Sequence, residues 1–409
     1  MRDMPHDIET IRNDFVELND GTYHYLDTAA TSLTPRPVLD AVNAYYETYR
    51  ANVHQGMFDE ALKATASYEE GRQSIAQFIC APSAKEVIIT SGATEASNML
   101  FRMLEESGVL SGDNKKNLVT TTMEHHSTFL PLERLARRMH KELRVIPLLG
   151  HALDYEKAET LITHETALVV VMLASNVTGM INDVRRIADL AHAHGAQVVV
   201  DATACAGHIP INVTSLGADA LYFSGHKMFA PTGVGALFVT MPLLLRLEPS
   251  IFGGHMVARI EGETPVWSQI PERFEAGTKN ISGVIGLGRA IAYINEIGLD
   301  RIRKHTAMLA CYTIHKLEQI PGIRVYSSCD GEKNIGIVSF SCDFAHPHDV
   351  ADILANDRVA VRPGHHCAIL LHDALGVPAT TRASFHIYNT RADADALILG
   401  VKKARNIFS

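Results

Sequence analysis

The sequence lacks any segment apolar enough to cross a membrane. Its longest apolar run, LVVVMLA at Leu168–Ala174, is far shorter than the roughly 20 residues that span a bilayer. The N-terminal stretch MRDMPHDIETIRNDF is charged and has none of the apolar core that is typical of a signal peptide. We therefore expect no membrane association and a cytoplasmic location.

Positive charge and closely spaced cysteines are also scarce. The 409 residues include 37 Lys and Arg against 46 Asp and Glu, and the net charge of -9 argues against the basic face that nucleic acid binding requires. The six cysteines include no CxxC pair, a pattern typical of reduced cytosolic thiols rather than of a disulfide framework. They are Cys80, Cys205, Cys311, Cys329, Cys342 and Cys367.

The length predicts two domains, and the larger has an α/β pattern. Between about residues 85 and 240, short β-branched runs alternate with stretches of helical apolar spacing. Strands that are apolar throughout and separated by helices indicate a mostly parallel sheet covered on both faces. The predicted strands are 86–90, 117–122, 143–148, 167–173, 196–202, 220–225 and 235–240.

The pattern changes after about residue 298. A long helix at 299–320 precedes a Pro-Gly stop, and a smaller α+β domain is predicted beyond it. Its predicted strands are 323–328, 335–342, 358–362 and 381–388, with a helix at 348–357. The predicted division is an N-terminal segment, 1–22, as a candidate to dock on the small domain, a large domain, 23–298, and a small domain, 299–409.

The first chemical motif is SGATEAS at 91–97. It follows a predicted strand and begins a helix, so Gly92, Ala93 and Thr94 present N–H groups that can hold a phosphate without a basic side chain. The alternative is an ordinary strand–turn–helix junction in which Thr94 caps the helix.

Two ionisable residues follow predicted buried strands. Asp201 stands at a carboxyl end, where open α/β sheets bind ligands, although it could simply form a turn or cap a helix. Lys227 in SGHK is a Schiff-base candidate, and the glycines on both sides argue against a solvated surface lysine. A phosphate cup, a carboxylate and a lysine are the parts of a pyridoxal phosphate site, in which the carboxylate keeps the pyridine nitrogen protonated.

At this point the chain resembles the class V aminotransferase branch of fold-type I pyridoxal-phosphate enzymes. Within it, the sequence is most similar to the group II cysteine desulfurases and selenocysteine lyases. The motifs that carry the resemblance run almost end to end: YLDTAAT (25–31), NVHQG (52–56), SGATEAS (91–97), MEHHS (123–127), ASNVTG (174–179), VDA (200–202), FSGHK (223–227), FEAGTKN (274–280), AVRPGHHCA (360–368) and RASFHIYNT (382–390).

The resemblance implies a role for each matching residue. Lys227 would form the Schiff base, Asp201 would pair with the pyridine nitrogen, and His125 would stack on the ring and pass protons. Asn176 and Arg382 would bind the substrate carboxylate, Arg382 through its bidentate fork. The phosphate would be held by Gly92, Ala93, Thr94, Ser224, His226 and, from the neighbouring subunit of a homodimer, Thr278.

The stretch GHHCAILLH at 364–372 allows three interpretations. A metal site needs converging ligands, and neighbours on an extended chain such as His365, His366 and Cys367 point apart, so we expect no metal here. A structural cysteine fits poorly in a polar, glycine-containing loop. In the family this cysteine is the thiolate that attacks the substrate sulfur, and nearby histidines would favour the thiolate.

Three positions depart from the family pattern. Ala204 stands where a glutamine usually bonds the cofactor's phenolic oxygen, Thr128 replaces an asparagine, and Gln55 replaces an arginine. A lost hydrogen bond is worth about 1 kcal/mol. We therefore expect changes in rate and specificity rather than in reaction class.

The resemblance implies a homodimeric cysteine desulfurase that converts L-cysteine to L-alanine. The sulfur would remain on Cys367 as a persulfide and pass to an acceptor protein, for iron–sulfur cluster or other sulfur-using biosynthesis. Selenocysteine lyase activity on L-selenocysteine is a close alternative. Another class V aminotransferase or lyase without sulfur transfer, and a non-catalytic scaffold for sulfur-assembly partners, are the remaining ones.

Overall fold

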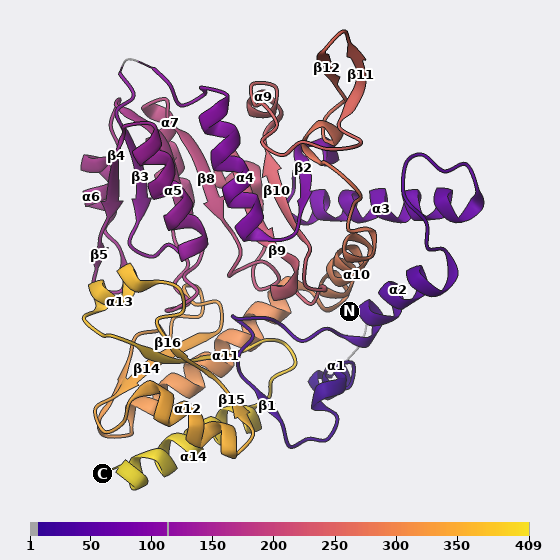
Figure 1. Cartoon of the computed structure of the whole chain (residues 1–409). Helices are drawn as coiled ribbons and strands as arrows, with labels where there is room; N and C mark the ends of the chain where they lie inside the picture. Colours follow the sequence, from indigo (N-terminus) through magenta and orange to yellow (C-terminus); the bar gives the residue numbers. More distant parts are fainter. Residues whose placement is uncertain (1–6, 113, 409) are drawn as a thin grey trace, which may run out of the picture.

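The largest feature of the computed structural model, which describes residues 7–112 and 114–408, is a seven-stranded mixed sheet (Figure 1). The strand order is β2-β10-β9-β8-β7-β3-β4, with β10 antiparallel to both neighbours and all other pairs parallel. The prediction of a mostly parallel sheet is thus confirmed. The strands are β2 (Val87–Thr90), β3 (Asn117–Thr121), β4 (Glu142–Ile146), β7 (Thr166–Met172), β8 (Gln197–Asp201), β9 (Ala220–Ser224) and β10 (Gly235–Val239).

Both faces of this sheet are buried. Alternate side chains of a strand enter different cores, as in β8, where Val198 and Val200 pack in one core and Val199 in the other. Helices α4 (Ala93–Glu106) and α5 (His126–Arg138) cover the face of Val199, and α7 (Val184–Ala193) covers the opposite face. Two-sided burial explains why the strands are apolar throughout.

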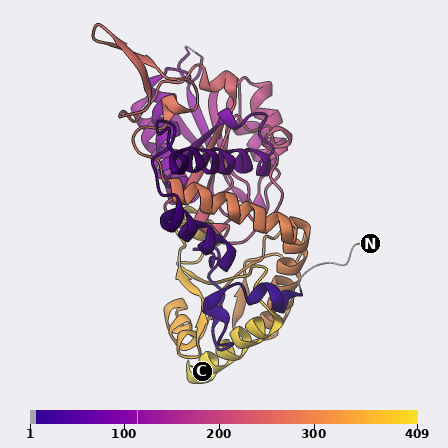
Figure 2. The same cartoon turned by 90° about the vertical axis from the view of Figure 1, so that its right-hand side faces the viewer.

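Three helices outside the predicted pattern complete the core beside β2. They are α2 (Arg36–Thr48), α3 (Asp59–Phe78) and α10 (Ile281–Ile297), and Figure 2 shows α3 and α10 side by side. Gly71 of α3 allows the close approach, because a Cβ there would lie 2.7 Å from Cγ1 of Val284 and 2.8 Å from its carbonyl oxygen.

The C-terminal part has its own antiparallel sheet and core. The strand order is β13-β14-β17-β16, covered by α11, α12 and α14. Its elements are α11 (Leu299–Glu318), β13 (Ile323–Val325), β14 (Ile337–Cys342), α12 (Pro347–Asn356), β16 (Arg362–Gly364), α13 (Ile369–Leu375), β17 (Thr380–Ser384) and α14 (Arg391–Phe408).

Two predicted strands of this part differ from the structure. The run 358–362 divides, because β15 (Val359–Ala360) pairs in parallel with β1 (His24–Tyr25), whereas β16 joins the four-stranded sheet at its edge. Pro363 has no N–H, which suits an edge strand. The run 381–388 ends at Ser384, since Asn389 turns the chain by accepting the N–H of His386.

The N-terminal segment contacts the C-terminal part. Arg12, at the end of α1 (Ile8–Arg12), donates to an Asp393 carboxylate oxygen at 3.0 Å and to the Tyr388 carbonyl at 2.7 Å. His24 Nδ1 lies 2.7 Å from the same carboxylate. Residues 1–6 of the predicted segment lie outside the described residues, and the boundaries at 22/23 and 298/299 stay predictions.

One pair of cysteines differs from the prediction that the thiols are reduced. A disulfide joins Cys311 to Cys329, so the prediction of reduced thiols is wrong for this pair. The two residues are 18 apart and meet only through a tertiary contact, which their spacing in the sequence does not reveal.

The remaining elements are short. They are β5 (Leu148–Leu149), β6 (Ala152–Leu153), α6 (Tyr155–Leu161), α8 (Val213–Leu216), α9 (Met241–Leu244), β11 (Val257–Glu261) and β12 (Thr264–Trp267), and the 3-10 turns are Val16–Leu18, Ala84–Glu86, Gly225–Lys227 and Glu272–Phe274. None of the helices in the described part of the chain is long and apolar enough to cross a membrane.

Candidate active site

A cavity of about 590 Å³ opens where strands of the large sheet end against the C-terminal part. Its size falls in the range of small-molecule sites. Most of the predicted site residues line it: Ala93, Thr94, His125, Asn176, Asp201, Ser224, His226, Lys227, Cys367 and Arg382. Gly92 directly precedes this lining, whereas Thr278 lies on a different cavity of the same chain. The sheet and the C-terminal loop therefore contribute to one site.

The start of α4 forms one end of the cavity. Gly92 is the N-cap with φ of +150°, a backbone conformation that favours glycine. Ser224 Oγ accepts the N–H of Ala93 at 2.8 Å and lies 3.1 Å from where a Cβ on Gly92 would stand. Burial lowers the pKa of His226 to about 4, so its ring is neutral at pH 7. The helix N-terminus and these polar groups are suited to a phosphate.

Asp201 ends β8 and is only 3% exposed. Its Oδ1 accepts the N–H of Thr203 at 2.8 Å, and its Oδ2 accepts the hydroxyl of Thr128 at 2.9 Å. The Thr128 oxygen also lies 2.8 Å from the hydroxyl of buried Tyr222. The threonine that departs from the family pattern thus holds the carboxylate, a contact that the sequence did not reveal.

Lys227 follows β9 in a short 3-10 turn and lies inside the cavity. Its pKa is lowered to about 8 by burial and, secondarily, by the positive charge of Arg382, while Asp201 opposes the shift. Among residues 7–112 and 114–408, no hydrogen-bond acceptor contacts its amine. A substantial fraction is therefore neutral near pH 8 and available as a nucleophile.

His125 caps α5 and lines the cavity beside Lys227. The N–H of Ser127 donates to its Nδ1 at 3.1 Å, which places the ring proton of the neutral form on Nε2. Burial, followed by the charge of Lys227, lowers the pKa of His125 to about 4. It is therefore a neutral imidazole with an available Nε2–H at pH 7.

Arg382 of β17 is buried and partly satisfied. It donates from Nη1 to the Asn176 carbonyl at 2.8 Å and from Nη2 to Asp27 at 3.4 Å. Burial lowers the pKa of Arg382 to about 10. Arg362 donates to both oxygens of Asp27, at 3.1 and 2.8 Å, and so fixes the carboxylate behind Arg382. Asp27 and Arg362 were not among the predicted site residues, although both lie in motifs that carry the resemblance.

Cys367 is exposed on a loop that several contacts fix in place. His366 and Cys367 have φ of +50° and +56°, a left-handed conformation that is costly for residues other than glycine. The N–H of His126 donates to the Cys367 carbonyl at 2.7 Å, and Asn176 Nδ2 donates to the His366 carbonyl at 2.8 Å. The His126 ring also accepts the N–H of Ile369 at 3.3 Å.

The electrostatic surroundings of Cys367 are positive. A Cys367 thiolate interacts with the charges of Lys227, Arg362 and Arg382. His366 contributes no charge, because burial lowers its pKa to about 2 and its Nε2 lies 2.9 Å from the Thr380 hydroxyl. The arginines and the lysine, rather than His366, are thus the cations near this thiol.

Unsatisfied buried atoms show that the site fits a polar ligand. Asn176 Oδ1, Thr203 Oγ1 and Arg382 Nε have no hydrogen-bond partner among the described residues, and all three residues line the cavity. Such groups are costly when left unpaired. Together with the free lysine, the helix N-terminus and Asp201, this donor set fits an aldehyde-bearing aromatic phosphate such as pyridoxal phosphate, with a carboxylate-bearing substrate beside it.

Comparison with known proteins agrees with the geometry. The family model of the class-V aminotransferases matches residues 24–397 of this chain. A probable cysteine desulfurase from Halalkalibacterium halodurans is 42% identical over 393 residues, covering 96% of this chain and 95% of that protein. One from Streptomyces coelicolor is 41% identical and covers 98% of both chains.

Solved structures of similar proteins have the same fold. The apo cysteine desulfurase of Thermococcus onnurineus superposes with a TM-score of 0.92 at 38% identity, covering 100% of this chain and 98% of that chain. A cysteine desulfurase from Escherichia coli in its S-sulfonic acid form gives 0.91 at 32% identity, covering 99% and 100%.

Proposed function

Because the chain belongs to the class-V aminotransferase family, we propose that it is a pyridoxal-phosphate-dependent cysteine desulfurase that uses Cys367 as the sulfur acceptor. One observation carries this proposal. A buried lysine with a pKa of about 8 and an exposed, conformationally fixed cysteine line the same cavity. A lysine serves cofactor chemistry in general, but only sulfur transfer needs the cysteine as well.

The residues at the inner end of the cavity would hold the cofactor. The α4 N-terminus with Gly92, Ala93 and Thr94, together with Ser224 and His226, would bind its phosphate, Asp201 its ring nitrogen, and Lys227 its aldehyde carbon. When bound, pyridoxal phosphate withdraws electrons from the substrate amino acid. Buried Asp201, kept in place by Thr128 and Thr203, supplies the negative charge that supports this withdrawal.

The protein's own groups position the substrate and move its protons. Arg382 Nε and Asn176 lie where they can bind the carboxylate of L-cysteine, and Asp27 limits the movement of the guanidinium. The neutral amine of Lys227 can take up a proton, and the Nε2–H of neutral His125 can donate one.

Cys367 performs the sulfur transfer. Its thiolate attacks the sulfur of L-cysteine, the new S–S bond forms, and the bond between that sulfur and the substrate β-carbon breaks. The electron pair remains with the carbon part, which gains a proton to become L-alanine, while Cys367 carries the persulfide. Arg362 and Arg382 are the cations beside the attacking thiolate.

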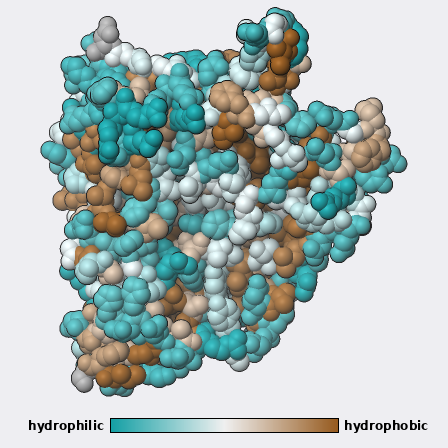
Figure 3. Space-filling model, in the orientation of Figure 1, coloured by the Kyte–Doolittle hydropathy of each residue, from teal (hydrophilic) through white to brown (hydrophobic). Residues whose placement is uncertain are grey.

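We further propose a cytoplasmic homodimer that passes the persulfide sulfur to an acceptor protein, for iron–sulfur cluster or other sulfur-using biosynthesis. Large apolar side chains are exposed on the β11–β12 hairpin, where Ile260 is 68% exposed, and before α3, where Met57 is 88% exposed. Figure 3 shows hydrophobic surface in both places, as is typical of surfaces that bind another protein chain. Thr278 lies in a cavity of about 380 Å³ between α2 and α10, from which it would serve the partner's phosphate site.

L-selenocysteine is a further substrate that this site would accept, because it differs from cysteine only at the atom that Cys367 attacks. The exposure of Cys367 supports release of either atom to an acceptor.

Product analysis tests the proposal. Holoenzyme incubated with L-cysteine should release L-alanine, and Lys227→Ala should abolish the reaction together with the absorbance band of the lysine-bound cofactor. The matched control Cys80→Ser, which changes an exposed cysteine outside the cavity, should keep both. Release of pyruvate and ammonia in place of alanine would assign the chain to another class V activity.

A further inference from the structure

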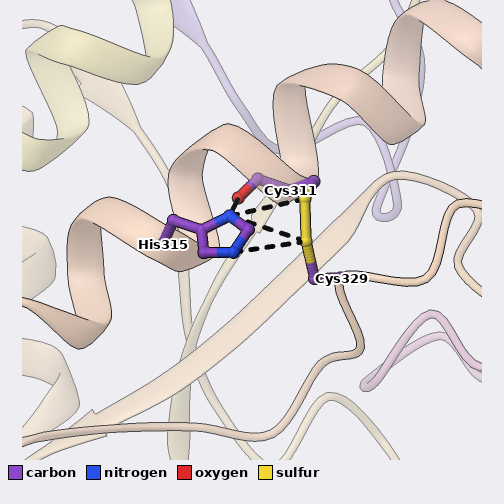
Figure 4. A group of neighbouring side chains, drawn as sticks. All are labelled: Cys311, His315 and Cys329. Atoms are coloured by element: carbon purple, nitrogen blue, oxygen red, sulfur yellow. Dashed lines mark hydrogen bonds between the residues drawn. A yellow bond between two sulfur atoms is a disulfide. The ribbon is translucent and has the colours of Figure 1, made fainter.

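A second group of reactive side chains lies in the C-terminal part, apart from the residues that line the active-site cavity. Figure 4 shows Cys311 and His315 on α11 facing Cys329, which belongs to the loop after β13. Cys311 and His315 are four residues apart and so share one helix face. His315 Nδ1 lies 3.5 Å from Cys311 Sγ and 3.6 Å from Cys329 Sγ. Potential ligand atoms of all three residues lie within 4.8 Å of one another.

Hydrogen bonds, in addition to the disulfide, hold the loop that carries Cys329 against α11. Arg303 of α11 donates to the carbonyl oxygen of Glu332 at 3.0 Å and to its carboxylate at 2.6 Å. Asn334 donates to the Ser328 carbonyl at 2.8 Å, and Ser328 Oγ accepts the N–H of Asp330 at 3.1 Å. These bonds flank Cys329 on both sides, so reduction of the disulfide leaves its sulfur above the helix.

We propose that, when the disulfide is reduced, Cys311, His315 and Cys329 bind one zinc-class divalent cation, and that disulfide formation expels it. Two thiolates and an imidazole are the soft ligand set that zinc prefers to magnesium or calcium. Within the described residues no fourth His, Cys, Asp or Glu belongs to the group, so a water completes the tetrahedron.

The orientation of His315 supports metal binding. Its Nδ1 lies 3.0 Å from the Cys311 carbonyl, and donation of Nδ1–H to that oxygen leaves a lone pair on Nε2. Metal-binding histidines typically donate their other ring N–H in this way. Nε2 lies 4.0 Å from Cys329 Sγ, whereas N and S ligands on one tetrahedral zinc are roughly 3.5 Å apart. The ring therefore needs a shift of about 0.5 Å toward Cys329 Sγ to reach the binding distance from that sulfur.

The switch between the two states is a balanced thiol exchange. Two molecules of a low-molecular-weight thiol reduce the Cys311–Cys329 bond, give two protein thiols and leave as their own disulfide. Zinc then replaces the two thiol protons, and the site becomes electrically neutral with the imidazole uncharged. The thiol pools of a reducing compartment supply the reductant for this conversion.

Equilibrium dialysis of the holoenzyme against zinc chloride tests this site, with metal content measured by elemental analysis. Reduced protein should bind one zinc per chain with two sulfur ligands by X-ray absorption, and oxidised protein should bind none there. Cys311→Ser, Cys329→Ser and His315→Ala should each weaken binding by at least about 10-fold. His315 is exposed, so its alanine variant provides the test even where a cysteine variant fails to fold.

The controls separate this site from the active-site thiol. Cys80→Ser and Cys367→Ser should both retain the zinc, and the band of the lysine-bound cofactor should be unchanged in the three ligand variants. The proposal is overturned when reduced and oxidised proteins bind equally, when Cys311→Ser retains full affinity, or when the zinc is lost only in Cys367→Ser. These outcomes do not depend on desulfurase activity, so they are distinct from failure of the proposed function.

Discussion

Burial sets the protonation state of the residues around Lys227. The amine, the His125 ring and the Arg382 guanidinium all lie in one cavity, and each has its pKa lowered mainly by loss of water. The result is a nucleophilic amine and a neutral imidazole beside a cation. These states are the ones that covalent cofactor binding and proton transfer require.

The Lys227 pKa leads to a pH prediction. The rate at which cofactor-free protein binds pyridoxal phosphate covalently should rise through about pH 8 and then level off, because only the neutral amine reacts. Arg382→Gln removes a charge that lowers this pKa, so its midpoint should move to higher pH. Stopped-flow absorbance measures both curves. A wild-type rate that keeps rising to pH 10, or an unchanged Arg382→Gln midpoint, contradicts the assignment.

We expect Thr203 to compensate for Ala204. Its hydroxyl is buried without a partner in the described part of the chain, next to Ala204 on the cavity wall, whereas Cys205 is fully buried and bonds the Ala202 carbonyl. Thr203→Val should move the pH midpoint of the bound cofactor's absorbance upward by about 0.7 unit, the equivalent of one hydrogen bond. Thr203→Ser should behave as wild type, and an unmoved midpoint in Thr203→Val would remove this role.

At the residue scale the sequence predicted most of the side chains that line the cavity but not the ones that hold them in place. Motifs identify Lys227 and Cys367 because their residue types are rare at a strand end or in a polar loop. Asp27 and His126 act on Arg382 and the Cys367 loop across hundreds of residues of sequence. Such contacts exist only after the chain folds, so residue spacing cannot reveal them.

At the scale of elements, the apolar period predicted the central sheet and its covering helices well. The apolar spacing did not predict α3 and α10. The buried faces of these helices include glycines, which interrupt a regular apolar stripe. Their packing depends on backbone proximity, as at Gly71 and Val284. The apolar spacing also did not predict that 358–362 divides into two strands. The division depends on pairing of β15 with β1, which is more than 300 residues away in the sequence.

The α3–α10 contact gives a stability prediction. Gly71→Ala should lower the free energy of unfolding by about 1–3 kcal/mol, because the new methyl group would meet the Val284 backbone. This loss outweighs the gain of at most about 1 kcal/mol in helix propensity. Gln73→Ala, an exposed change on the same helix, should stay within about 0.5 kcal/mol. Urea titrations measure both, and a stabilised Gly71→Ala protein would show that α3 and α10 are not packed as described.

At the scale of the whole molecule, buried neutral histidines make the free energy of unfolding fall as the pH drops. Burial lowers the pKa of His208 to about 4, against about 6.5 in an unfolded chain. Between these values the unfolded state binds a proton that the folded state does not, so stability falls as pH drops from about 6.5 to 4. Each such histidine contributes about 1.4 kcal/mol per pH unit in this window.

Unfolding free energies at pH 7, 6 and 5 measure this linkage. His208→Gln should lose less stability than wild type between pH 6 and 5, by up to about 1.4 kcal/mol. His164→Gln, on the surface, should follow the wild-type curve. An identical pH slope in His208→Gln and wild type would mean that His208 is protonated in the folded protein.

Mass spectrometry after treatment with L-cysteine shows whether one cavity combines the cofactor lysine with a sulfur-accepting cysteine. We expect one added sulfur atom on the peptide that contains Cys367, present in Cys80→Ser and absent in Cys367→Ser. Alanine formation should be lost in Cys367→Ser while the cofactor band remains. Added sulfur on buried Cys205, or on no cysteine while alanine still forms, would contradict it.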